Sequence, residues 1–169
     1  FEDQSFDAVV CTEVLEHLSE PVFGKAVGEL RRVASKYIVL GVPYRQDLRQ
    51  GMTRCADCNT AYHEDLHCRC FRGPKDIQTL FPGFVIKATV LLAQREQIRS
   101  VLFRRFRYWL IEPRAYSPLA RCPKCGSGNK AMPKRRLLRW FFDGLAWRMP
   151  KETNPHWMIV LLRRKELKP

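Results

Sequence analysis

The sequence has no apolar run that approaches the roughly 20 residues a membrane-spanning helix needs. No signal peptide is visible at its start. It has no low-complexity tract, and its only internal repetition is a recurring Cys-x-x-Cys. Apolar residues are plentiful, however, because they make up 46% of the 169 residues. That share excludes a disordered chain and predicts one domain with a sizeable core.

Acidic residues are scarce relative to basic ones, with 17 Asp and Glu against 30 Lys and Arg, which gives a net charge of +13. Such a chain is attracted to anionic partners, namely nucleic acid, anionic lipid headgroups or a phosphorylated substrate. The charge is unevenly distributed. Residues 1–30 lean acidic, whereas the Arg-rich stretches follow residue 95.

The seven cysteines do not fit a closed disulfide framework, because their number is odd. Two pairs, Cys55 with Cys58 and Cys122 with Cys125, have the Cys-x-x-Cys spacing of a metal-binding turn, and histidines follow the first pair. We therefore expect metal ligation in a reducing, cytoplasmic compartment.

The first 43 residues predict a strand, a helix and a second strand. Residues 6–14 form a short apolar run that suits a buried strand. Ser19 is a plausible helix N-cap, and apolar residues then recur at helical spacing to residue 33. Residues 37–43 form a second buried strand that Pro43 ends. This pattern indicates a βαβ unit and hence the α/β class.

The remaining residues predict further elements of the same class. A short helix is expected at residues 73–82 and a strand at 83–93. Two Arg-rich amphipathic helices follow at 95–110 and 134–149, and residues 156–165 close the chain as a strand. The second Cys-x-x-Cys lies in the loop between the two basic helices.

The stretch "QSFDAVVCTEVLEHLSEP" resembles the fourth-strand region of class I S-adenosylmethionine-dependent methyltransferases. The following stretch "YIVLGVPYR" resembles their fifth strand, and the last two predicted strands resemble the sixth and seventh. The resemblance implies a Rossmann-like sheet and transfer of a methyl group from S-adenosylmethionine to an unidentified acceptor.

Two features of that family have no counterpart in this chain: the glycine-rich turn after strand one, where glycine lets the backbone approach the cofactor closely, and the acid that ends strand two. Both are expected upstream of Phe1, so the resemblance implies a C-terminal fragment, inactive by itself. We thus expect one partial methyltransferase domain over 1–169. It combines core segments 1–50, 71–94 and 156–169, a Cys/His metal loop at 51–70, and a basic helical insert at 95–155 that carries the second Cys-x-x-Cys.

In an open parallel sheet, ligands sit beyond the carboxyl ends of the strands. His17 is a candidate general base there, because an unperturbed histidine titrates near neutrality. Alternatively, Glu13 and His17 cap the following helix, and Glu16 is expected to be a solvated acid at its start. The expected cofactor- or substrate-binding residues are Cys11, Thr12, Glu13 and His17 after the first strand, and Pro43 and Tyr44 after the second.

Two ligand sets are open for a structural zinc ion, which takes four ligands tetrahedrally. One set combines both Cys-x-x-Cys pairs: Cys55, Cys58, Cys122 and Cys125. Asn59 and Gly126 follow these pairs and tolerate the left-handed turn that they need. The other set lies within one loop and resembles the zinc knuckle of nucleic-acid-binding proteins: Cys55, Cys58, His63 and Cys68, with His67 as a further candidate ligand.

The two basic helices allow three interpretations. They cover the edge of the sheet with arginines facing water, or they lie on an anionic membrane surface, or they bind a phosphate backbone. As an insert they are also suited to select the methyl acceptor, for which an anionic or lipid-linked molecule is a candidate. The main alternative to a methyltransferase is a non-enzymatic zinc-knuckle module that binds nucleic acid or another anionic partner.

Overall fold

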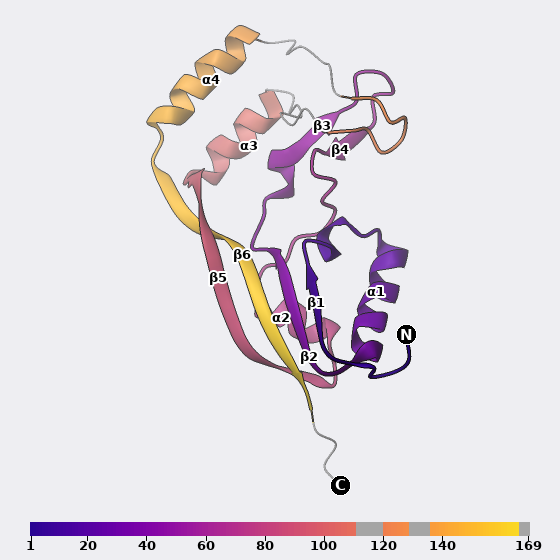
Figure 1. The fold of residues 1–169 in the computed structure, drawn as a ribbon. Helices are drawn as coiled ribbons and strands as arrows, with labels where there is room; N and C mark the ends of the chain where they lie inside the picture. Colours follow the sequence, from indigo (N-terminus) through magenta and orange to yellow (C-terminus); the bar gives the residue numbers. More distant parts are fainter. Residues whose placement is uncertain (111–119, 129–135, 166–169) are drawn as a thin grey trace. The chain divides into compact units, whose positions relative to one another are not determined.

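The computed structural model describes residues 1–110, 120–128 and 136–165 (Figure 1). They divide into two compact units that are each assembled from separate stretches of the chain. The first unit, termed the sheet unit, comprises residues 1–46, 68–94 and 155–169. The second, termed the cysteine unit, comprises residues 47–67 and 95–154. The assignment of segments to a methyltransferase core and two inserts stays a prediction.

The sheet unit begins with the expected strand, helix and strand. Strand β1 (Phe6–Thr12) and strand β2 (Ala34–Pro43) pair in parallel, with Cys11 opposite Leu40. Between them lie a short 3-10 helix, η1 (Leu15–His17), and helix α1 (Glu20–Val33). Ser19 occupies the N-cap position of α1, but its side chain makes no capping hydrogen bond.

The strands are ordered β1-β2-β6-β5, so the last strand lies between β2 and β5 (Figure 1). Strand β5 spans Phe84–Ile98 and strand β6 spans Lys151–Arg164, and β6 is antiparallel to β2. Alternate residues of the two central strands are fully buried, as expected for a sheet covered on that face. These residues are Ile38, Leu40, Val42, Met158, Val160 and Leu162.

The core of the sheet unit is completed by residues from α1 and from helix α2 (Pro74–Leu80). Phe23 and Val27 of α1 pack into this core, as does Ile77 of α2. Phe81 and Phe84, which flank the turn after α2, contribute the largest fully buried side chains, with ring centroids 6.4 Å apart. The prediction that residues 6–14 form a buried strand is wrong, however: of the residues of β1 only Cys11 is buried, because β1 lies at an edge of the sheet.

The cysteine unit contains a small hairpin and two helices. The 3-10 helix η2 (Leu48–Gly51) leads into strands β3 (Met52–Arg54) and β4 (Ala61–His63), which pair antiparallel. Helix α3 spans Val101–Leu110 and helix α4 spans Arg136–Arg148. Lys134 and Arg135, predicted in the second basic helix, lie outside the described residues.

Three predicted boundaries in this region are wrong. The strand predicted at 83–93 continues to Ile98, the first basic helix begins at Val101 instead of residue 95, and the final strand begins at Lys151 instead of residue 156. The cause is pairing between these segments: Arg99 N–H donates to the carbonyl of Pro150 at 2.9 Å, and Gln97 donates to Glu152 at 3.0 Å. Pairing with a distant segment overrides the local helical periodicity.

Candidate functional site

The carboxyl end of β1 holds the first group of predicted site residues. Cys11 is buried, whereas Thr12 and Glu13 are exposed. Glu13 has a φ of 54°, in the left-handed region that non-glycine residues rarely adopt. Its backbone N–H donates to the carbonyl of Gly41 on β2 at 3.0 Å, which fixes this conformation. Backbone strain of this kind is common at functional sites, so the turn after β1 is a candidate functional site.

Glu16, expected to be solvated, is instead fully buried in η1. The turn that follows β1 directs Leu15 and Glu16 inward, and the backbone N–H of Cys68 donates to the Glu16 carbonyl at 2.8 Å. Both carboxylate oxygens of Glu16 are buried, and the carboxyl group of Glu13 lies near enough to be affected by their charge. We did not predict this pair from the sequence. The signal that could have revealed it is two glutamates three positions apart in the turn that follows a strand.

The surroundings of Glu13 change the acidity of its carboxyl group. Loss of solvation raises the pKa of Glu13 to about 7, and the nearby charge of Glu16 and a hydrogen bond with it act in the same direction. Burial likewise raises the pKa of the Cys11 thiol, with the Glu16 charge as the second cause. A carboxyl group beside a second, negatively charged carboxylate loses its proton less readily, so Glu13 is suited to hold a proton near neutral pH.

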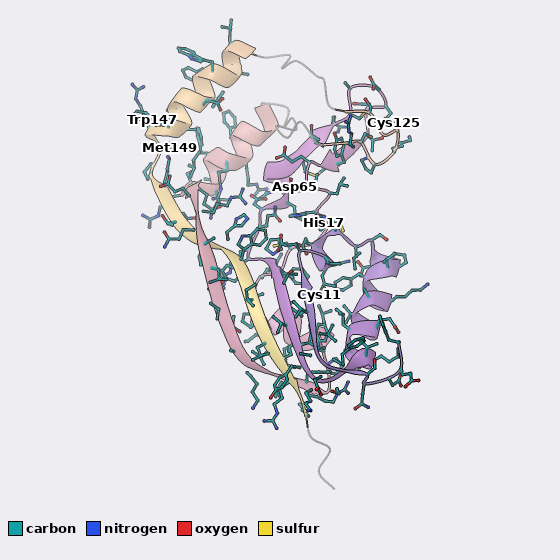
Figure 2. All side chains as sticks on the ribbon, in the orientation of Figure 1. Cys11, His17, Asp65, Cys125, Trp147 and Met149 are labelled. Atoms are coloured by element: carbon teal, nitrogen blue, oxygen red, sulfur yellow. The ribbon has the colours of Figure 1, made fainter. Side chains whose placement is uncertain are left out.

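The other residues predicted at this edge are placed at strand ends or in the adjoining turns. His17 is exposed at the end of η1, where its N–H donates to the carbonyl of Val14 at 3.1 Å (Figure 2). Pro43 is buried at the end of β2, opposite Trp157 in register. Tyr44 is half-buried and its N–H donates to the carbonyl of His156 at 2.8 Å. Because β1 and β2 are parallel, all of them lie toward the carboxyl edge.

The first Cys-x-x-Cys in the cysteine unit forms a tight turn. Asn59 N–H donates to the carbonyl of Cys55 at 3.1 Å, and Cys55 N–H donates to the carbonyl of Thr60 at 2.9 Å. Asn59 has a φ of 55°, so the left-handed residue expected after the pair is present. This backbone directs the thiols of Cys55 and Cys58 to the same side, as a metal-binding turn requires.

The second Cys-x-x-Cys repeats that turn. Gly126 N–H donates to the carbonyl of Cys122 at 2.9 Å, and Cys122 N–H donates to the carbonyl of Ser127 at 2.9 Å. Gly126 has a φ of 72°, again left-handed. The hydroxyl of Ser127 donates to the carboxylate of Asp57 in the first turn, which ties the two turns together.

The four thiols of these turns converge. The Sγ atom of Cys55 lies 3.5 Å from that of Cys125, and the Sγ atom of Cys58 lies 3.5 Å from that of Cys122. All four sulfur atoms lie within 4.8 Å of one another. A tetrahedral zinc ion with Zn–S bonds of about 2.3 Å places its sulfur ligands about 3.8 Å apart. The donor set and its spacing therefore fit zinc.

The thiols differ in acidity before any metal is considered. Hydrogen bonding with Thr60 lowers the pKa of Cys58 to about 6. The pKa of Cys125 is raised, because hydrogen bonds with Cys55 and Cys58 outweigh the lowering effect of the Ser127 backbone. Tyr62, buried beside the cluster, has a raised pKa from burial and from the charges of Cys122, Cys55 and Cys125. One thiolate is therefore available at neutral pH, and metal binding would displace the remaining protons.

The alternative ligands of the single-loop hypothesis are placed differently. The thiol of Cys68, a residue of the sheet unit, donates to the carbonyls of Glu16 and Leu18 at 3.3 and 3.1 Å. His63 is buried, and its Nδ1 accepts a hydrogen bond from the N–H of Asp65 at 3.1 Å. The rings of His63 and His67 stack at 5.1 Å between centroids. His63, Asp65 and His67 thus form a separate group of potential ligands within the cysteine unit.

Gly51 was not singled out from the sequence, yet the fold depends on it. The imidazole of His63 lies directly against its Cα atom, so that any β-carbon would clash with the ring. The N–H of Glu64 donates to the carbonyl of Gly51 at 2.7 Å. The sequence gives no local signal for this contact, because Gly51 and His63 lie at opposite ends of the hairpin and are twelve positions apart.

Comparisons with known proteins relate this chain to methyltransferases. Residues 1–37 match the family model described as "Methyltransferase domain". No curated protein matches the chain. A solved structure of a protein from Bacillus halodurans C-125, provisionally described as a methyltransferase, has a similar fold. It is 12% identical with a TM-score of 0.50, over 99% of this chain and 73% of that one. The predicted α/β fold of methyltransferase type is thereby confirmed.

Proposed function

We propose that this chain is part of an S-adenosylmethionine-dependent methyltransferase and contributes residues around the methyl acceptor together with a structural zinc site. The observation that carries the proposal is that the segment matching the methyltransferase domain, residues 1–37, contains the strained turn after β1. In open α/β sheets, ligands bind beyond the carboxyl ends of the strands, where this turn lies.

S-adenosylmethionine would supply an electrophilic methyl group. The residues of this chain do not by themselves fit the whole cofactor, because no glycine-rich turn follows a strand. The only G-x-G among the nine glycines is Gly126–Gly128, which belongs to the second cysteine turn. We therefore derive no step through the cofactor and consider only what the residues of this chain contribute.

The contribution that we assign to the turn after β1 is proton transfer. Glu13 is exposed, and its pKa of about 7 lies near the value at which a general base is most effective. The buried Glu16 beside it contributes to the raised pKa of Glu13. His17, predicted as the base, lies exposed four residues along the same segment and is the second candidate for this role.

The contribution that we assign to Cys55, Cys58, Cys122 and Cys125 is a structural zinc site. Four thiolates complete the coordination of zinc, so no position remains for a substrate or a water molecule. The site would join two stretches of the cysteine unit, 47–67 and 95–154, each of which supplies one turn. A metal in this position stabilises the folded unit because the unfolded chain lacks the preformed ligand set.

The test uses the protein translated from the complete reading frame. Binding of S-adenosylmethionine is measured by calorimetry, and transfer of labelled methyl groups is measured with fractionated cell extract as the source of acceptors. We expect binding and label incorporation. Glu13→Gln should lower the transfer rate by about 10²-fold or more, as loss of a general base does, and leave cofactor binding intact.

The control variant is Glu2→Gln, which changes an exposed carboxyl outside the strands and should leave transfer unchanged. Absence of cofactor binding would refute the methyltransferase proposal as a whole. Full transfer by Glu13→Gln together with a large loss in His17→Asn would move the role of the base to His17.

A further inference from the structure

The helices α3 and α4 of the cysteine unit pack on each other through aromatic rings. Phe142 of α4 is buried, and its ring centroid lies 6.2 Å from that of Phe103 and 6.0 Å from that of Phe106 on α3. Leu138, one turn before Phe142, is half-buried. One face of α4 is therefore occupied by its neighbour.

A second face of α4 is apolar and exposed. Successive residues of an α-helix are separated by about 100°, so positions 137, 140, 141, 144 and 147 lie on one side, away from Phe142. The apolar residues at these positions have large exposed fractions: Leu137 84%, Trp140 78%, Phe141 59% and Trp147 78%. We call these four residues the aromatic face.

The neighbouring helix α3 also exposes apolar side chains. Leu102 of α3 is 79% exposed and Phe106 is 51% exposed. Soluble domains rarely expose several large apolar side chains together without a binding partner. No helix in the described part of the chain is long and apolar enough to cross a bilayer, so a membrane partner would be contacted at its surface.

The charge around this surface specifies the chemistry of the partner. Residues 95–154 contain fifteen Lys and Arg against four Asp and Glu, a net charge of +11 out of +13 for the chain. Among the described residues, Glu96 pairs with Lys151 at 3.2 Å and Glu152 with Arg104 at 3.9 Å. The surplus of basic groups attracts an anionic partner.

We propose that the aromatic face docks the protein on an anionic lipid surface. Exposed Trp, Phe and Leu beside arginines are the combination that an interfacial helix uses, since the apolar groups enter the acyl boundary while the cations contact headgroups. A nucleic acid would use the cations and could stack on aromatic rings, but it would leave Leu137 and Leu102 in water. The inference is independent of the proposed methyltransferase activity.

The experiment sediments the protein, translated from the complete reading frame, with lipid vesicles. Vesicles of phosphatidylcholine mixed with phosphatidylglycerol are compared with vesicles of phosphatidylcholine alone, at low and high salt. We expect binding to the anionic vesicles that weakens with salt, and little binding to the neutral ones. The double variant Trp140→Ala, Trp147→Ala should lower the partition coefficient by about tenfold or more, because two large apolar groups are removed.

The matched control is Val22→Ala, which removes an apolar group that is 48% exposed on α1 of the sheet unit and should leave vesicle binding unchanged. Since all three substituted residues are exposed, each variant is expected to fold, and its circular dichroism spectrum verifies this. Equal binding to both kinds of vesicle, or unchanged binding of the double variant, would overturn the proposal. Retention on single-stranded RNA without sedimentation with either vesicle would assign the face to nucleic acid instead.

Discussion

The Sγ atoms of Cys55 and Cys125 lie 3.5 Å apart although seventy positions separate the two residues in the sequence. The Sγ atoms of Cys58 and Cys122 also lie 3.5 Å apart. The pairs are therefore crossed: the first cysteine of each turn lies beside the last cysteine of the other turn. Two turns with the same backbone hydrogen bonds thus form one compact group of thiols.

The substitution Cys122→Ser should abolish stoichiometric zinc binding and lower the thermal stability of the cysteine unit, because three thiolates leave the zinc coordination incomplete. Zinc content is measured by elemental analysis, and unfolding by circular dichroism. Cys68→Ser is the matched control, since the hydroxyl can also donate to the carbonyls of Glu16 and Leu18. Stoichiometric zinc in Cys122→Ser would contradict the four-cysteine site.

The substitution Gly51→Ala should destabilise the hairpin of the cysteine unit by about 1–3 kcal/mol, because the added methyl group would overlap the buried ring of His63. The free energy of unfolding is measured by urea titration. Gly73→Ala is the control: no atom lies within 4 Å of its added β-carbon, and its φ of 174° is open to any residue. Equal stabilities of the two variants would show that the His63 contact does not constrain this position.

Two glycines of the sheet unit should respond to alanine in opposite directions. Gly28→Ala in α1 meets no neighbouring atom and should stabilise the protein by roughly 0.5–1 kcal/mol, as alanine loses less backbone entropy in a helix. Gly41→Ala places a β-carbon 2.7 Å from Thr12 Cγ2 and 2.9 Å from Ile159 Cδ1, and should destabilise it by about 1–3 kcal/mol. The free energy of unfolding of both variants is measured by urea titration. A stabilising effect of Gly41→Ala would contradict the close contacts with Thr12 and Ile159.

The Glu13 carboxyl should make the folded protein less stable as the pH rises from 4.5 to about 7. Within this window the folded chain keeps a proton that the unfolded chain has already released, so the folded state is favoured at the acidic end. Glu13→Gln cannot ionise and should remove the dependence that Glu13 produces. Urea titrations across the window compare this variant with the wild type and with Glu2→Gln, and parallel curves for all three proteins would refute the pairing of Glu13 with Glu16.

The elements that the sequence predicts well are those formed by neighbours in the chain. The strand, helix and strand of residues 6–43 follow from apolar periodicity and from Pro43, and the structure contains them with small shifts. Asn59 and Gly126 likewise predict the left-handed residues of the cysteine turns, because that preference belongs to the residue itself.

The features that the sequence does not predict depend on contacts between distant segments. Glu16 follows the pattern of a solvated helix-start acid, but a segment 52 positions away bonds its carbonyl and η1 directs its side chain inward. The extension of β5 to Ile98 depends on pairing with residues 150–152, which local propensity does not contain. Both differences show tertiary structure overriding local preference.

The crossed arrangement of the thiols has a consequence for biosynthesis. Cys122 follows Cys55 by 67 positions, so at about 5–20 residues per second the ribosome delivers the second turn roughly 3–13 s after the first. During that interval the first turn holds two thiols without the two that complete the group. On the zinc site proposed above, the nascent chain is then open to oxidation or to capture of the wrong ion until Cys122 and Cys125 emerge.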